Sequence, residues 1–273
     1  MELDITQQQF AEVVGTPTTA AAELYNRVRP WFAPTIQDLQ DLINYQVADL
    51  PNDDDELKAA AVAYVCLTSF WSAAPSIDLV WTPTGFGIVS NNTLAPASRE
   101  RVDALRTELH DRAIRAKYDL LDAAYRHTAY ATAQPDAPFV VLPSQYRRVT
   151  GDNITDTDFD KLVGKIKYAE RRLRRLISAA EVDHLRSTFH ESLANAAAIT
   201  PVQADVVKLV QQFCIAAANQ LTHADSFLAD ILQIVNDEAN AADFPEYIAS
   251  SEYIANNSEP YENSVEKPSF FFC

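Results

Sequence analysis

The stretch "PVQADVVKLVQQFCIAAANQLTHADSFLADILQIV", residues 201–235, is the most regular amphipathic segment of the 273-residue chain. Its apolar residues recur at helical spacing from Val202 to Val235, and Thr200-Pro201 before it is a helix-start signal. A similar apolar stripe runs from Phe159 to Leu193, after a cap at Thr155 or Asp156. Two long amphipathic helices in series predict an antiparallel helical hairpin over residues 154–244. The expected fold class is therefore mainly α: a helical bundle with long amphipathic helices.

Residues 1–132 predict a first helical domain, on which the hairpin of residues 154–244 is expected to pack. Three short helices open it, one over residues 6–14, one after Pro17 that ends before Pro30, and one that begins near Thr35. Residues 53–56 are acidic, and acidic side chains are stabilising in the first turn of a helix. We therefore expect a helix that begins there and runs to about residue 74. Its apolar part, residues 59–75, is too short for a membrane span, which needs about 20 apolar residues, so a buried core helix is expected. A further helix is expected from Ser98 to about residue 132.

The segment "LVWTPTGFGIVSNN", residues 79–92, interrupts this helical pattern. β-Branched and aromatic residues flank a turn at residues 82–85 with proline second and glycine fourth, so we predict a projecting β-hairpin over residues 77–90. Gly87 marks a bulge or a close backbone approach. Aromatic side chains at the tip, Trp81 and Phe86, suit the core of a protein interface. The alternative is that the hairpin packs on its own helices.

Two further segments lack helical periodicity. Residues 133–153 carry three prolines and one short apolar run, and predict an irregular crossover with room for one short strand. Residues 245–273 are polar, acidic and broken by proline, and predict an extended C-terminal arm. The arm ends in Phe270, Phe271 and Phe272, which could dock on a neighbouring subunit; a frayed terminus is the alternative.

The charge balance argues against two classes of partner. With 38 acidic and 22 basic residues the net charge is −16, so the chain repels the phosphates of nucleic acids and anionic membranes. The same charge would suit a conduit through which DNA passes without specific binding, although solubility alone is the simpler explanation. The first ten residues lack the basic and apolar regions of a signal peptide. The three cysteines show neither a disulfide framework nor metal-ligand spacing.

No motif with specific catalytic chemistry occurs. Gly85-Phe86-Gly87 lies in the predicted hairpin rather than at a strand-to-helix junction, so it is not a phosphate loop. The best metal candidate comprises Glu181, His184, His190 and Glu191, but six residues separate the two histidines, which places them on different helix faces. A solvated polar face is the expected explanation. We therefore predict no catalytic site, no cofactor, no metal and no enzymatic activity.

The run "KIKYAERRLRRL", residues 165–176, is the one basic cluster. Arg171, Arg172, Arg174 and Arg175 surround Leu173. They form either a solvated helix face paired with acids, or a docking face for an acidic partner or an acidic neighbour in a ring. The predicted interface residues are Trp81, Pro83, Gly85, Phe86, Gly87, Arg171, Arg172, Arg174, Arg175, Phe270, Phe271 and Phe272.

The segment "LVWTPTGFGIVSNNTLAPASRERVDAL", residues 79–105, resembles the hallmark of an uncharacterised family from phages and prophages of gut anaerobes. Its T-P-T-G-F-G-I-V-S hairpin followed by A-P-A-S-R-E-R-V carries the resemblance. The helices of residues 35–74, the last of which begins with acidic residues, are more distantly similar to the head–tail connector adaptors of tailed phages. Those proteins are small, helical and assembled as a ring beneath the portal. The helices after Thr155 have no counterpart in these adaptors.

The resemblance implies a virion structural protein, a head–tail connector subunit that forms a homo-oligomeric ring between portal and tail. Its expected partners are other copies of itself and the portal and tail proteins, with no membrane. It would assemble in the host cytoplasm and reside in the virion. The alternatives are a tail-completion or terminator protein, a cytoplasmic helical scaffold or regulator that binds a protein partner, and an enzyme with scattered carboxylates.

Overall fold

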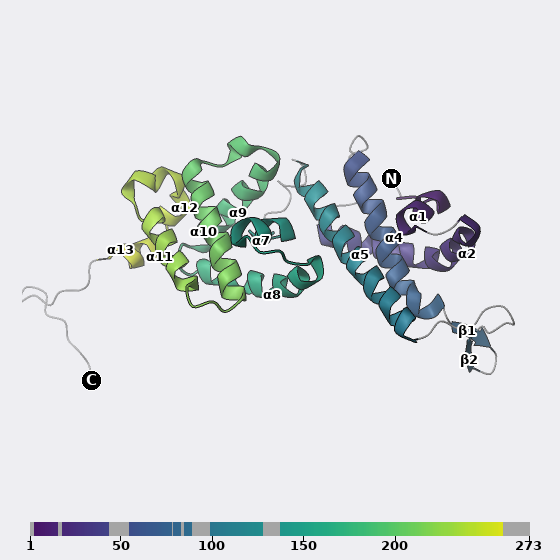
Figure 1. Cartoon of the computed structure of the whole chain (residues 1–273). Coiled ribbons are helices and arrows are strands. Elements are labelled where there is room, and N and C mark those ends of the chain that lie inside the picture. The colour runs from purple at the N-terminus through teal and green to yellow at the C-terminus, as the bar shows by residue number, and fades with distance from the viewer. Residues whose placement is uncertain are drawn as a thin grey trace, which may run out of the picture.

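The computed structural model describes residues 3–15, 18–43, 55–77, 79–82, 85–88, 99–127 and 137–258. In this part of the chain the fold is mainly helical, as predicted, and Figure 1 shows two groups of helices side by side. We call α1 to α5 the N-terminal lobe and α7 to α13 the C-terminal lobe. One continuous cluster of buried apolar residues includes side chains from both lobes. The division into the four predicted segments stays a prediction.

The N-terminal lobe begins with short helices close to the predicted positions: α1 (Gln7–Val14), α2 (Thr18–Val28), a 3₁₀ turn η1 (Arg29–Trp31) and α3 (Phe32–Ile43). Thr6 caps α1 in a capping box with Gln9, and Gly15 ends it with a φ of 77°. The third helix begins at Phe32 rather than near Thr35. The hydroxyl of Thr35 donates to the carbonyl of Trp31, so Thr35 lies inside the helix instead of capping it.

Two long helices, α4 (Asp55–Ile77) and α5 (Arg99–Tyr125), cross the N-terminal lobe next to each other (Figure 1). By length and composition alone, α4 could cross a membrane. In the structure it packs against α1, α3 and α5, and Val65 and Cys66 on it are fully buried. Pro75 lies in its last turn rather than ending it. This packing is that of a central core helix.

Between α4 and α5 lie two short strands, β1 (Leu79–Thr82) and β2 (Gly85–Ile88). They pair antiparallel, with Leu79 opposite Ile88 and Thr82 opposite Gly85. Figure 1 places them at the end of the N-terminal lobe that lies away from the C-terminal lobe. Gly87 pairs directly with Val80 in this unbroken register, so the bulge predicted there is wrong. The contacts proposed for Trp81 and Phe86 concern side chains outside the described ones, and Pro83 lies outside the described residues.

The C-terminal lobe is built from short and medium helices. They are α7 (Pro143–Thr150), α8 (Asp156–Leu173), α9 (Ala179–Ala194), η3 (Ala196–Ala198), α10 (Pro201–Ala218), α11 (Ala224–Val235), η4 (Glu238–Asp243), α12 (Pro245–Ile248) and α13 (Ser251–Asn257). Thr155 and Thr200 cap α8 and α10 as the sequence predicts. The pairs α8–α10 and α10–α11 are in contact, so α10 lies at the centre of the lobe.

The prediction of one long helical hairpin over residues 154–244 is wrong in detail, because each expected helix is broken. The first break follows Leu173 and ends at Ser178, which has a φ of 68° and caps α9 through its hydroxyl. The second follows Ala218, where Gln220 has a φ of 58°. The amide of Leu221 donates back to the carbonyl of Ala216, which closes the end of α10 in the manner of a Schellman motif. Leu221, expected in the buried stripe, is consequently 45% exposed.

Two other expectations are corrected. The described part of the crossover, from residue 137, contains helix α7 where an irregular chain or a strand was expected, because Pro143 occupies the first turn and the side-chain oxygen of Gln145 accepts a hydrogen bond from the amide of Leu142, the N-cap residue. The first part of the expected arm is also helical, since α12 and α13 cover residues 245–248 and 251–257. Tyr247 anchors them as a fully buried side chain. The rest of the arm, including Phe270, Phe271 and Phe272, lies outside the described residues.

The seam between the lobes lies between α5 and the pair α8–α9. Lys117 and the hydroxyl of Tyr118 both donate to the carboxylate of Asp160, and the rings of Tyr118 and Phe159 are 5.4 Å apart. Arg115 forms a 3.4 Å ion pair with Asp156. An ion pair that is partly buried and flanked by an aromatic contact stabilises the packing of two helices more than a fully exposed ion pair does. The seam therefore fixes α8 on the N-terminal lobe.

Candidate functional site

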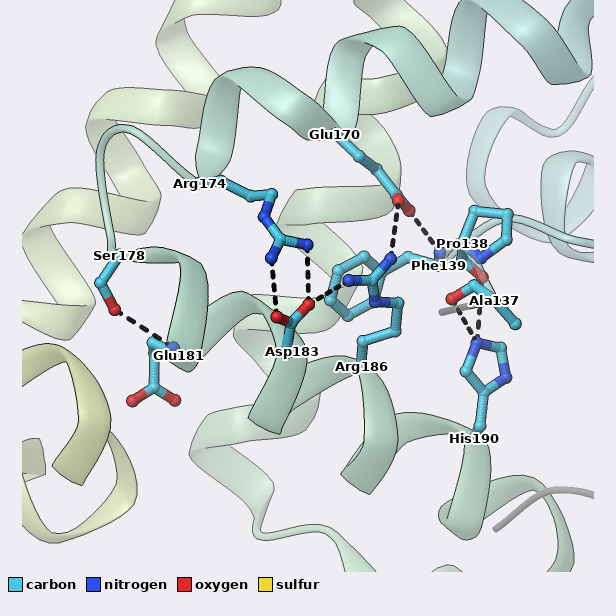
Figure 2. A network of polar contacts seen from close by, with 10 residues as sticks. All are labelled: Ala137, Pro138, Phe139, Glu170, Arg174, Ser178, Glu181, Asp183, Arg186 and His190. Carbon is cyan, nitrogen blue, oxygen red and sulfur yellow. Dashed lines mark hydrogen bonds and ion pairs between the residues drawn. The ribbon is translucent and has the colours of Figure 1, made fainter. Parts of the chain in front are cut away.

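The break between α8 and α9 brings charged residues on either side of it, between residues 170 and 186, into one network, drawn in Figure 2. Arg174 donates two hydrogen bonds to Asp183, of 2.8 and 2.7 Å. Arg186 donates to the same carboxylate from α9 and lies 3.9 Å from the carboxylate of Glu170 on α8. Arg186 and Glu170 are 6% and 5% exposed. A buried arginine is thus held between two carboxylates.

Glu170 also fixes the backbone of the crossover. Its carboxylate accepts a hydrogen bond from the amide of Phe139, a fully buried residue (Figure 2). Burial raises the pKa of the Glu170 carboxyl to about 7, although the Phe139 amide and the charge of Arg186 oppose this shift. The network therefore contains a carboxyl group that titrates close to neutral pH.

His190 holds the neighbouring part of the crossover. Its Nε2 lies 2.9 Å from the carbonyl oxygen of Ala137 and 3.1 Å from that of Pro138, so this nitrogen carries the proton and donates it. Its ring stacks on Tyr125 of α5, with ring centroids 5.0 Å apart. Burial lowers the pKa of the imidazole to about 4. A neutral His190 therefore joins the crossover to both lobes.

Glu181 and His190 correct the prediction of a solvated polar face over residues 181–191. Glu181 is fully buried, and its carboxylate accepts a 2.9 Å hydrogen bond from the amide of Tyr247. Burial raises the pKa of this carboxyl to about 7. His184 is exposed, so the two histidines do point to different faces. Within the described residues no group of histidine, cysteine and acidic side chains could hold a metal ion.

The network borders a pocket of about 160 Å³ on the surface between α8 and α9. Its lining residues are Pro138, Lys167, Glu170, Arg171, Arg174, Val182 and Arg186. Four of them are cationic and one is a carboxylic acid. Lys167 and Arg171 are exposed and form no ion pair within the described residues. The pocket is therefore a local positive site in a chain whose net charge is −16.

The structure separates the four arginines of the predicted basic cluster. Arg171 and Arg174 line the pocket. Arg172 instead forms a 3.1 Å ion pair with Asp225 of α11, and its guanidinium lies 5.4 Å from the centroid of the Phe213 ring. Arg175 is exposed in the turn after α8. Arg172 and Arg174 thus pair with acids, as the solvated-face alternative expects, whereas Arg175 forms no ion pair within the described residues.

Sequence reasoning missed two contributors to this surface. Arg186 lies twelve residues beyond Arg174 and joins the pocket only because the chain reverses between α8 and α9. Tyr168 is 69% exposed and occupies the face of α8 next to the pocket, three residues from Lys165 and from Arg171. Tyrosine and arginine are enriched in protein interfaces. The quoted basic run contains Tyr168, so its i, i+3 spacing with the cations was the available signal.

Comparisons with known proteins bear on the N-terminal lobe. Residues 21–138 match the model of a family of unknown function, DUF6712. No curated protein and no solved structure matches the chain significantly. The matched segment includes β1, β2, α4 and α5 and ends at Pro138, the residue whose carbonyl accepts from His190. Over residues 21–138 the chain is thus similar to this family of unknown function, and apart from Pro138 the pocket lies beyond the match.

Proposed function

We propose that this protein is a virion structural protein, a head–tail connector subunit that assembles with copies of itself into a ring between portal and tail. The observation that carries the proposal is the separation of charge along the chain. Residues 161–175 hold seven of the 22 basic residues and a single acidic one. Residues 1–77 hold eleven acidic residues and three basic ones. One chain thus carries a segment of net positive charge and a segment of net negative charge.

Opposite surfaces on one subunit suit a heterologous contact, in which the basic surface of one copy meets the acidic surface of the next. Such contacts generate a closed ring when the rotation from each copy to the next brings the last copy back to the first. On the acidic side, Asp38 and Asp41 of α3 are exposed and share a helix face. On the basic side, Tyr168 offers a large exposed aromatic ring among cations. Complementary charge would set the register, and the tyrosine would supply apolar contact area.

The resemblance of residues 79–105 to a phage and prophage family supplies the biological setting. In that setting the β1–β2 element and residues 270–272 would contact adjacent subunits, the portal or the tail. The acidic balance of the chain would keep the path of DNA free of specific binding. The partners, the location in the virion and the absence of enzymatic activity belong to the same proposal.

The decisive experiment separates particles from the induced native host on a density gradient and quantifies this protein against the major capsid protein by mass spectrometry. A low, portal-like copy number supports the connector. A capsid-like copy number would place it in the head shell. Absence from particles would refute a virion role and favour a cytoplasmic scaffold that binds a protein partner.

Two matched double variants test the proposed ring contact. Lys165→Glu with Tyr168→Ala changes one exposed cation and one exposed ring on α8. Arg101→Glu with Leu105→Ala makes a comparable change on α5, where Leu105 is 47% exposed. We expect the α8 variant to abolish ring formation, measured by light scattering during size-exclusion chromatography, and to be lost from particles. The α5 variant should assemble normally, and equal behaviour of the two would refute the contact.

A further inference from the structure

We propose that the pocket between α8 and α9 binds a dianionic oxyanion of the phosphate class. The pocket is lined by cationic side chains from two helices: Lys167, Arg171 and Arg174 on the α8 side, and Arg186 from α9. This inference goes beyond the proposed assembly role and does not depend on it. Three features of the pocket support it: the charge balance, the side chains that are fixed before a ligand binds, and the size.

The charge balance of the pocket favours a dianion. Asp183 neutralises one guanidinium through its hydrogen bonds with Arg174 and Arg186, and Glu170 lies within 3.9 Å of Arg186. Four cations therefore face two carboxyl groups. When both carboxyl groups are ionised, the two charges left over are those of Lys167 and Arg171, which form no ion pair within the described residues. A phosphate group carries about −1.5 to −2 charges at neutral pH, so it would balance this excess.

The deeper cations are held in place before any ligand binds. Arg186 is 6% exposed and bonded to Asp183, and Arg174 is held by two hydrogen bonds to the same carboxylate (Figure 2). A side chain already fixed in the free protein loses less conformational entropy on binding than a mobile one does. Guanidinium groups also match the geometry of phosphate oxygens, to which they can donate two hydrogen bonds.

The size of the pocket admits a phosphoryl group, and its surroundings disfavour a long polyanion. Its volume of about 160 Å³ is well above the ~10–15 Å³ that a single water molecule needs. A long polyanion is disfavoured because the net charge of −16 repels it at a distance. Another pocket, of about 300 Å³ at the start of α8, is lined by Asp111, Asp156 and Asp158 and lacks this excess of positive charge.

Two double variants with the same loss of charge test the site in the purified full-length protein. Lys167→Gln with Arg171→Gln removes the two uncompensated cations of the pocket. Lys165→Gln with Arg175→Gln removes one lysine and one arginine from exposed positions of the same segment that do not line it. Isothermal titration calorimetry at constant ionic strength measures the affinity for inorganic phosphate, with sulfate as a dianion of unchanging charge.

We expect saturable binding of both anions to the wild type. The pocket variant should bind at least about tenfold more weakly, as for the loss of a hydrogen bond to a charged group, and the control variant should stay within about twofold of the wild type. Equal losses in both variants would show that net charge alone is sensed and would overturn the site. So would binding of acetate as tight as that of phosphate, or no saturable binding at all.

A second arm identifies the source of the phosphoryl group. Free O-phosphoserine is titrated against the wild type under the same conditions. Binding tighter than that of phosphate assigns the pocket to a phosphate monoester, and weaker binding assigns it to the free anion; both outcomes support the site. Since the ring test changes Lys165 and Tyr168 and the pocket test changes Lys167 and Arg171, failure of either proposal leaves the other open to measurement.

Discussion

Replacing Glu170 by glutamine should change the pH dependence of stability in a direction that the structure dictates. The folded protein raises the pKa of this carboxyl from 4.5 to about 7, chiefly because the group is buried. Between these two values the folded state binds the proton more tightly than the unfolded state does. The stabilisation from this group is therefore fully present below pH 4.5 and is lost as the pH rises through 7.

The magnitude follows from the two pKa values. Integrated between pH 5 and pH 8, the shift of this one carboxyl lowers the free energy of unfolding of the wild type by about 2.5 kcal/mol. Glutamine does not titrate, yet its carbonyl oxygen can still accept the hydrogen bond from Phe139. Arg186 keeps its contact with Asp183. Relative to the wild type, the Glu170→Gln protein should thus gain about 2–3 kcal/mol in stability from pH 5 to pH 8.

The assay is urea unfolding of both proteins at pH 5, 6, 7 and 8, followed by far-ultraviolet circular dichroism and checked for two-state behaviour. Glu181 and His190 titrate in the same range but are present in both proteins, so the difference between the curves isolates Glu170. Glu238→Gln, at an exposed position, is the matched control. A difference that stays constant with pH would refute the reasoning. A difference of opposite sign would mean that the ion pair with Arg186 outweighs the cost of burial.

Three further predictions concern the backbone, the core and the thiols. Gln220→Gly should stabilise the protein by about 1 kcal/mol in urea unfolding, because glycine adopts the positive φ of this position without strain. Phe139→Ala should cost about 3–5 kcal/mol in the same assay, because the side chain is fully buried, whereas Phe139→Leu should cost less. Burial raises the pKa of the Cys66 thiol to about 12 and that of Cys214 well above its usual range. In a Cys273→Ser background the native protein should therefore not react with a disulfide reagent at pH 8, and the urea-unfolded protein should expose both thiols.

The helices could be predicted where their signals are local. Thr6, Thr155 and Thr200 each cap a helix through a side-chain hydrogen bond to an amide three residues on, and such a signal needs no tertiary structure. The break at Gln220 could not be predicted in this way, whereas Ser178 does carry such a signal, since its hydroxyl accepts from the amide of Glu181 three residues on. Neither position holds glycine or proline, and the apolar period continues through both. Each nevertheless has a positive φ, 68° at Ser178 and 58° at Gln220, which non-glycine residues seldom adopt.

The buried polar groups could not be predicted for a related reason. A carboxylate or an imidazole in an amphipathic helix usually faces water, because burial without a partner is costly. Glu181 and His190 are buried because backbone groups elsewhere in the chain supply partners, namely the amide of Tyr247 and the carbonyls of Ala137 and Pro138. Those partners become neighbours only in the folded chain. The basic run itself was visible in the sequence, whereas Arg186 and the pocket were not.

The crossover explains why these polar groups converge. Residues 137–142 lack regular secondary structure but pass through the core, so their backbone groups need partners from side chains. Glu170 accepts from the amide of Phe139, and Gln211 of α10 donates a 2.8 Å hydrogen bond to its carbonyl. His190 serves the two carbonyls before it. The charge that Glu170 brings into the core requires Arg186 beside it, and Arg186 in turn forms one wall of the pocket. The same need for hydrogen-bond partners that fixes the crossover therefore places a rigid, buried cation in the wall of the pocket.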